Sequence, residues 1–128
     1  RTPQIVPAPA SPSNPSGGDV WVCDDSDYNS NVGGLWRSTD GAATWTKFSG
    51  VTKVSAVSFG KSSSGTGYAV YIYGKVGSEL GVYQSEDYGA TWTKLADPSI
   101  KKVTAIAGDR QNAGKVFIGT AGRGVFQY

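Results

Sequence analysis

Apolar residues along this chain fall into short runs that alternate with polar and glycine-rich turns. No stretch places apolar residues at positions i, i+3, i+4 and i+7 over three helical turns, and no apolar run approaches the length of a membrane span. The alternation predicts β-strands instead, and the clearest set of four lies at 53–59, 68–73, 81–85 and 91–95. The 18 glycines and the 4 Trp, 7 Tyr and 4 Phe residues agree with many short strands joined by tight turns.

One segment of the chain is repeated 47 positions later. Residues 34–48 read GLWRSTDGAATWTKF, residues 81–95 read GVYQSEDYGATWTKL, and a third copy begins at Gly124. A period in the forties with four short strands per unit is typical of a β-propeller blade. The repeat therefore predicts an all-β fold of four-stranded antiparallel sheets, which form an incomplete β-propeller of about two to three blades.

The repeat also divides the chain into units. Residues 19–48 are expected to form a partial blade, residues 53–95 a complete blade and residues 103–128 a partial final blade. Residues 1–18 contain five of the six prolines and leave two alternatives. They form an extended linker, because proline removes a ladder donor and favours polyproline II, or residues 4–6 form the inner strand of the first blade.

Two turns carry the Asp-box pattern S-x-D-x-G-x-T-W, the second of them at every fixed position and the first with Ala42 in place of the glycine. In such a turn the Asp side chain accepts hydrogen bonds from backbone N–H groups, glycine permits a left-handed backbone, and the Trp ring is expected to pack between neighbouring blades. We therefore assign these residues a structural and not a catalytic role. They are Ser38, Asp40 and Trp45 in the first turn, and Ser85, Asp87, Gly89 and Trp92 in the second.

A polar loop with alternating carboxylate and amide side chains follows the apolar run at 20–23. Asp25, Asp27 and Asn29 have the residue types and the spacing that can wrap Ca²⁺. However, Ser30 stands where an EF-type loop needs glycine, and no bidentate Glu follows. A solvated turn is the favoured interpretation, and a metal site is the alternative.

The composition excludes several kinds of catalysis. The chain has no histidine, which excludes Ser–His triads and His-ligated zinc. Glycoside hydrolysis needs two facing carboxylates, and no loop carboxylate has an apolar local context that would raise its pKa for acid work. No catalytic residue and no cofactor are predicted. If a glycan binds, Tyr28 is a candidate stacking ring and Arg123 a candidate donor to hydroxyl groups; the alternative is that both are ordinary surface residues.

Taken together, these motifs resemble glycoside hydrolase family 74, the xyloglucanases and reducing-end-specific xyloglucan cellobiohydrolases. The resemblance rests on GDVWV at 18–22, GLWRSTDG at 34–41, VSAVSFGK at 54–61, YIYGKV at 71–76 and GTAGRGVF at 119–126. These segments occur in the order and near the spacing of that family's C-terminal region. Members have two seven-bladed propellers with the substrate cleft between them, and they invert configuration with two aspartates whose motifs are not present in this sequence.

The resemblance implies a secreted parent enzyme that hydrolyses the β-1,4-glucan backbone of xyloglucan, a plant cell-wall polysaccharide. This segment would supply scaffold and glycan-binding surface and would be inactive alone. Its expected partners are xyloglucan, through the parent, and the remaining blades of the parent or a second copy of the chain. A net charge of +2 without basic clusters argues against nucleic acid, and no membrane partner is expected. The alternative function is a non-enzymatic Asp-box propeller that binds proteins or glycans.

Overall fold

The structure is a computed structural model in which the fold of the described residues is all-β, with eleven strands and no helix. Within that part of the chain no helix is therefore available to cross a membrane. The described residues are 4–10, 17–24, 34–64, 67–77, 79–96, 103–109, 111, 114–120 and 124–127.

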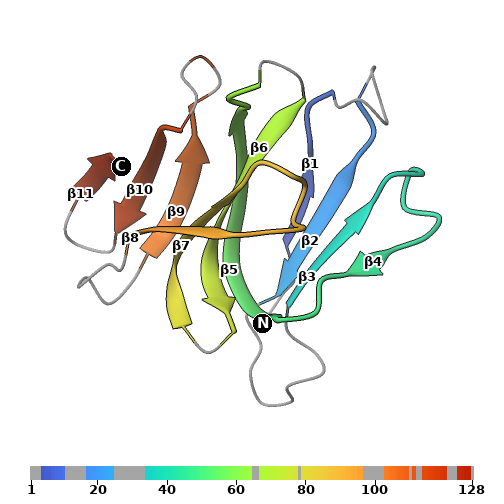
Figure 1. Cartoon of the computed structure of the whole chain (residues 1–128), viewed down its shortest axis with the longest axis horizontal. Coiled ribbons are helices and arrows are strands. Elements are labelled where there is room, and N and C mark those ends of the chain that lie inside the picture. The colour runs from blue at the N-terminus through green and yellow to red at the C-terminus, as the bar shows by residue number, and fades with distance from the viewer. Residues whose placement is uncertain are drawn as a thin grey trace.

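The strands form three antiparallel sheets that lie side by side, with the second sheet between the other two (Figure 1). In each sheet the strands are neighbours in chain order, as in a meander, and the third sheet has three strands in the described residues. The first sheet is β1 (Gln4–Pro7), β2 (Val20–Asp24), β3 (Gly34–Ser38) and β4 (Thr46–Lys47); the second is β5 (Val51–Lys61), β6 (Tyr68–Val76), β7 (Glu79–Ser85) and β8 (Thr93–Ala96); the third is β9 (Val103–Gly108), β10 (Val116–Thr120) and β11 (Gly124–Gln127).

Strand β1 completes the first sheet. It pairs antiparallel with β2, from Gln4 opposite Cys23 to Pro7 opposite Val20, and the backbone N–H of Ala8 donates to the carbonyl of Asp19 at 3.0 Å. Proline is tolerated here because β1 is an edge strand, where one missing donor need not interrupt the sheet. The first sheet thus has four strands, one more than the partial blade expected from residues 19–48.

Strand β6 explains why one apolar run in the sequence does not alternate with polar residues. Every residue from Tyr68 to Gly74 is buried, because both faces of the second sheet are covered by another sheet. Side chains alternate between the two cores: Tyr68, Val70 and Ile72 enter the core shared with the first sheet, and Ala69, Tyr71 and Tyr73 enter the core shared with the third.

Aromatic rings fill the core between the first and second sheets. Trp21 of β2 stacks on Phe48, with centroids 5.3 Å apart, and meets Tyr68 of β6 edge-on at 6.5 Å. Phe59 of β5 meets the same tyrosine edge-on at 5.1 Å. Offset and edge-on pairs of this kind each contribute about 0.5–1.5 kcal/mol beyond their burial. This core fixes the second sheet against the first.

The second and third sheets approach most closely along β5 and β9. A Cβ built on Gly108 would lie 2.7 Å from the carbonyl oxygen of Phe59, so only glycine allows this approach. The backbone N–H of Lys61 donates to the carbonyl of Asp109 at 2.8 Å, and the Ser58 hydroxyl accepts from the N–H of Gly108 at 3.1 Å. Antiparallel meander sheets of four strands that pack face to face in succession are the blades of a β-propeller. The predicted all-β propeller fold is confirmed.

Candidate functional site

The residues nominated from the sequence as ligand contacts cannot be placed. Tyr28 and Arg123 lie outside the described residues, as do Asp25, Asp27 and Asn29 of the candidate calcium loop. In the part of the chain that the structure describes, no group of three or more His, Cys, Asp or Glu side chains could hold a metal ion. The site is therefore built from the two Ser-x-Asp turns (residues 38–45 and 85–92) and from the groove beside the first of them.

In the first turn the Asp40 carboxylate is the centre of a local hydrogen-bond network. The Ser38 hydroxyl donates to its Oδ1 at 2.8 Å, and the backbone N–H of Thr44 donates to the same oxygen at 2.9 Å. The Thr44 hydroxyl donates to Oδ2. Ser38 Oγ in turn accepts the N–H of Ala42 at 2.9 Å. This network closes the connection between β3 and β4.

The second turn repeats these bonds at equivalent atoms. The Ser85 hydroxyl donates to Asp87 Oδ1 at 2.7 Å and accepts the N–H of Gly89 at 2.8 Å. The N–H and the hydroxyl of Thr91 donate to the two Asp87 oxygens at 2.9 and 2.6 Å. The same geometry from two sequences that differ at the intervening positions shows that Ser, Asp and Thr specify the turn.

Both turn carboxylates are held in their ionised form. Hydrogen bonds from the side chain and the backbone of Thr44, and from Ser38, lower the pKa of Asp40 to about 2. Burial acts to raise the pKa of Asp87, but the bonds from Thr91 and Ser85 outweigh it, so the net change is a lowered pKa. A general acid needs a raised pKa, so neither carboxylate suits that role.

The backbone of these turns enters the left-handed region at corresponding places. Gly89 has φ of 93°, and Ala42 at the same position of the first turn has φ of 74°. A Cβ on Gly89 would also lie 2.6 Å from Cε1 of Phe48, so this glycine is required both by the backbone angle and by the neighbouring ring. Ala42 has only the first requirement, which it meets with some strain.

The expected packing of the two turn tryptophans holds for one of them. Trp92 is half-buried and packs against the core between the first and second sheets. Trp45 is 41% exposed, so the prediction that it lies between blades is wrong for this chain. The reason is geometric: Trp92 has the first sheet beside it, whereas no sheet among the described residues lies on the corresponding side of the first.

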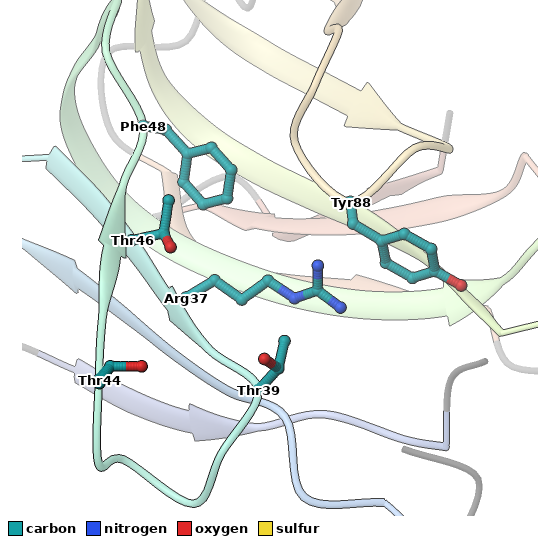
Figure 2. A pocket seen from close by; sticks show the side chains of 6 residues that line it. All are labelled: Arg37, Thr39, Thr44, Thr46, Phe48 and Tyr88. Carbon is teal, nitrogen blue, oxygen red and sulfur yellow. The ribbon is translucent and has the colours of Figure 1, made fainter. Parts of the chain in front are cut away.

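A pocket of about 130 Å³ lies where the first turn meets the second sheet. In Figure 2 the Arg37 side chain extends from β3 toward Tyr88 of the second turn, and threonines lie on both sides of it. Hydroxyl groups, one guanidinium group and two aromatic rings can bind polar groups, but they provide no carboxylate for acid–base chemistry. The lining residues are Arg37, Thr39, Thr44, Thr46, Phe48 and Tyr88.

Arg37 of this pocket also belongs to a buried polar network that joins the two sheets. Arg37 Nη2 donates to Asp19 Oδ2 at 2.6 Å, and the Tyr68 hydroxyl donates to the same oxygen at 2.6 Å. Trp21 Nε1 donates to the Tyr68 hydroxyl at 3.0 Å, and the Arg37 guanidinium lies 4.7 Å from the centroid of the Tyr88 ring. Burial, followed by the bond to Asp19, raises the pKa of Tyr68 far above its usual value, so the hydroxyl remains a donor.

Sequence reasoning missed this network. Asp19 lies directly before β2, Arg37 lies on β3, and Tyr68 lies on β6 of the other sheet. No local sequence motif therefore contains all three residues. The one available signal was Asp19, a carboxylate directly before an apolar strand, which is rare unless a partner compensates its charge.

Comparison with known proteins points to one group of enzymes. No family model matches the chain. It is 33% identical over 111 residues to a xyloglucanase from Paenibacillus, 42% identical over 112 residues to a xyloglucanase from Acetivibrio thermocellus, and 36% identical over 104 residues to one from Hypocrea jecorina. These matches cover 84, 84 and 77% of this chain but only 11, 13 and 12% of the relatives, so the chain spans about an eighth of their length.

Solved structures agree with these sequence matches. The chain aligns with the GH74 enzyme of Niastella koreensis with a TM-score of 0.78 and 30% identity, over 97% of this chain and 17% of that one. It aligns with the GH74 xyloglucanase of Xanthomonas campestris with a TM-score of 0.74 and 27% identity, over 98% of this chain and 16% of that one. The blades, their turns and their sequence therefore place the chain in glycoside hydrolase family 74, as a segment that covers only a small part of the length of the family's members.

Proposed function

We propose that this chain is the C-terminal propeller portion of a secreted, xyloglucan-hydrolysing glycosidase of the endo-β-1,4-glucanase type. In this role it contributes scaffold and glycan-binding surface, and the catalytic carboxylate pair comes from elsewhere in the enzyme. The observation that carries the proposal is the match of most of the chain to xyloglucanases from three organisms, each of which is several times longer.

The state of the carboxylates supports the scaffold role. Inverting glycosidases need one carboxylic acid and one carboxylate free to act on either side of the scissile bond. In the described residues six Asp and Glu side chains bond to a polar group of the chain itself. These residues are Asp19, Asp40, Glu79, Glu86, Asp87 and Asp109.

The two repeated turns support a structural role for this segment, because each turn closes a hairpin within a blade. We propose that residues 38–45 and 85–92 are Asp-boxes, also called BNR repeats, in which Asp40 and Asp87 hold the hairpins closed. Their hydrogen bonds are local to each turn, and their carboxylates accept bonds from Ser and Thr instead of facing a ligand. Turn stability, and not chemistry, is then their contribution to the parent enzyme.

Glycan binding by this segment is proposed to involve Tyr28 as a stacking ring and Arg123 as a donor to sugar hydroxyls. Native gels cast with and without xyloglucan test this directly with the 128-residue protein. We expect xyloglucan to retard the protein, and Tyr28→Ala and Arg123→Ala to reduce that retardation. Lys61→Ala, at an exposed position of β5, is the matched control and should migrate like the parent chain.

Two results of this experiment would count against the proposal. Equal migration with and without the polysaccharide would remove the glycan-binding role and favour a pure scaffold or a protein-binding propeller. Retardation that all three variants retain would mean that the glycan contacts lie elsewhere on the chain.

A further inference from the structure

The pocket beside the first turn has walls from two blades. Arg37 of β3 is directly opposite Thr46 of β4, so their side chains share one face of the first sheet. Phe48 lies two positions after Thr46, and Tyr88 of the second turn lies across from Arg37 (Figure 2). The lining residues all belong to the described part of this chain, so variants of this chain alone can test what the pocket binds.

The backbone of Tyr88 is strained. Its φ is 57°, in the left-handed region, and the corresponding residue of the first turn is Gly41, with a φ of 70°. Glycine adopts such an angle freely, whereas a bulky side chain there is a rare outlier. The Tyr88 ring lies 4.7 Å from the Arg37 guanidinium and forms one wall of the pocket. Backbone strain of this kind gathers at ligand sites, so it indicates that the ring serves binding as well as packing.

The pocket offers both hydrogen-bond donors and acceptors. The bond from Arg37 to Asp19 uses one of the five N–H groups of the guanidinium, and Arg37 Nε is buried with no hydrogen-bond partner among the described residues. The Thr44 hydroxyl donates to Asp40, but its oxygen can still accept. A ligand group that both donates and accepts, such as an alcohol, therefore fits these partners better than a pure acceptor.

The charges around the pocket favour a neutral ligand. Asp19 neutralises Arg37 at 2.6 Å, and the ionised Asp40 carboxylate is bonded to Thr44 of the pocket wall. An anionic ligand would be repelled by this additional negative charge, and a cationic ligand by the guanidinium group. The rings of Phe48 and Tyr88 add apolar surface against which the C–H groups of a ligand can pack.

We propose that this pocket binds one neutral pyranose ring, the terminal sugar of a glycan chain. Its hydroxyl groups would accept from Arg37 and bond to the threonines, and its C–H face would pack against Tyr88. The volume of about 130 Å³ agrees with a single ring, because a cavity of roughly 150 Å³ holds one benzene molecule. The pocket is therefore a site for a chain end and not for a chain interior.

The Nε–H signal of Arg37 in NMR spectra of the isotope-labelled chain reports binding at this place. We expect D-glucose and D-xylose to shift this signal with a dissociation constant of about 1–10 mM, as a single small ring allows. Glycerol, which has hydroxyl groups but no ring, should bind about fivefold more weakly or less. Cellohexaose should bind as tightly as glucose, because only its end enters the pocket.

Two variants remove single features of the pocket. Thr46→Val removes one hydroxyl group at an exposed position, keeps the branched shape, and should raise the dissociation constant of glucose about fivefold. Tyr88→Gly removes the ring, places at this position the residue that the first turn has, and should raise the constant about tenfold or more. Thr52→Val, at an exposed position of β5 outside the pocket, is the matched control and should change nothing.

Several results would overturn the inference. The Arg37 signal could remain unmoved by both sugars, or move equally in Thr46→Val, Tyr88→Gly and the parent chain. Sodium acetate that binds more tightly than glucose would make the pocket an anion site, and glycerol that binds as tightly would show that no ring is recognised. Cellohexaose that does not bind would mean that only a free monosaccharide fits, and much tighter binding of cellohexaose would mean a groove for a chain interior.

The inference does not rest on the proposed function. Tyr28 belongs to the segment that connects β2 to β3, whereas the pocket lies at the other end of β3, where the chain turns toward β4. Tyr28→Ala should therefore leave the shift of the Arg37 signal unchanged. If xyloglucan failed to retard the protein while glucose still moved this signal, the proposed glycan surface would fail and the pocket would stand.

Discussion

Arg37 and Asp19 form an ion pair of 2.6 Å whose carboxylate is completely buried at the joint between two blades. Removing one partner of such a pair leaves an uncompensated charge in a medium that solvates it poorly. The pair is therefore a point at which the first and second sheets depend on each other, through Arg37 on one side and Tyr68 on the other.

The first prediction concerns this pair. Asp19→Ala should destabilise the protein by about 3 kcal/mol or more, because the Arg37 guanidinium, itself only 16% exposed, loses its anionic partner. Tyr68→Phe removes one hydrogen bond to the same carboxylate and should cost less, about 1 to 1.5 kcal/mol. Urea titration followed by tryptophan fluorescence measures both. Equal, small effects would show that the pair does not hold the sheets together.

The second prediction tests the role of the turn carboxylates. Asp87→Ala should lower the free energy of unfolding by about 1–2 kcal/mol, because the bonds from Ser85 and Thr91 lose their acceptor. Binding of xyloglucan by the folded variant should not change. An unaltered urea midpoint together with lost binding would instead assign Asp87 to a ligand site.

The third prediction is a pH dependence. The pKa of Asp40 is about 2 in the folded chain, below its ordinary value of 3.8, so ionisation of this group favours the folded state. Its contribution to stability should be complete above about pH 4 and should be lost as the pH falls from there through about 2. Asp40→Asn should flatten the dependence of the thermal midpoint on pH in this window. A variant whose midpoint falls as steeply as that of the parent would disprove the assignment.

The fourth prediction follows from the left-handed backbone of the first turn. Ala42→Gly should stabilise the protein by about 0.5–1 kcal/mol, because glycine adopts the observed φ of 74° without a Cβ clash. Gly89→Ala should destabilise it, since the added methyl group also meets the Phe48 ring. Thermal unfolding of the two variants should therefore shift in opposite directions. Shifts of the same sign would show that the turn backbone is not the cause.

The fold could be predicted from the sequence because its determinants are local and repeated. The strands follow from short apolar runs, and each Ser-x-Asp turn closes through residues at most four positions apart. The exposure of Trp45 could not be predicted, because the same motif buries Trp92 where a sheet lies beside it. Burial at a blade surface depends on the neighbouring blade and not on the turn itself.

Less of the candidate site could be predicted from the sequence, for a related reason. Arg37 lies on β3, Asp19 lies directly before β2, and Tyr68 lies on β6 of the other sheet, 49 positions after Asp19, so their meeting depends on tertiary packing. The residues that the sequence did nominate, Tyr28 and Arg123, lie outside the described residues, and their role stays a prediction. The family could be recognised because its short sequence segments occur in a fixed order, and this order can be read without knowledge of the tertiary contacts.

The most direct test of the central claim, that this segment is a scaffold of a xyloglucanase and not its catalytic part, is a reducing-sugar assay of the 128-residue protein on xyloglucan. We predict no release above a buffer blank, because Asp40 and Asp87 are engaged in their turns and Asp19 in an ion pair, so these carboxylates provide no free pair. Release of reducing ends that a single Asp or Glu substitution abolishes, in a variant that remains folded, would contradict it.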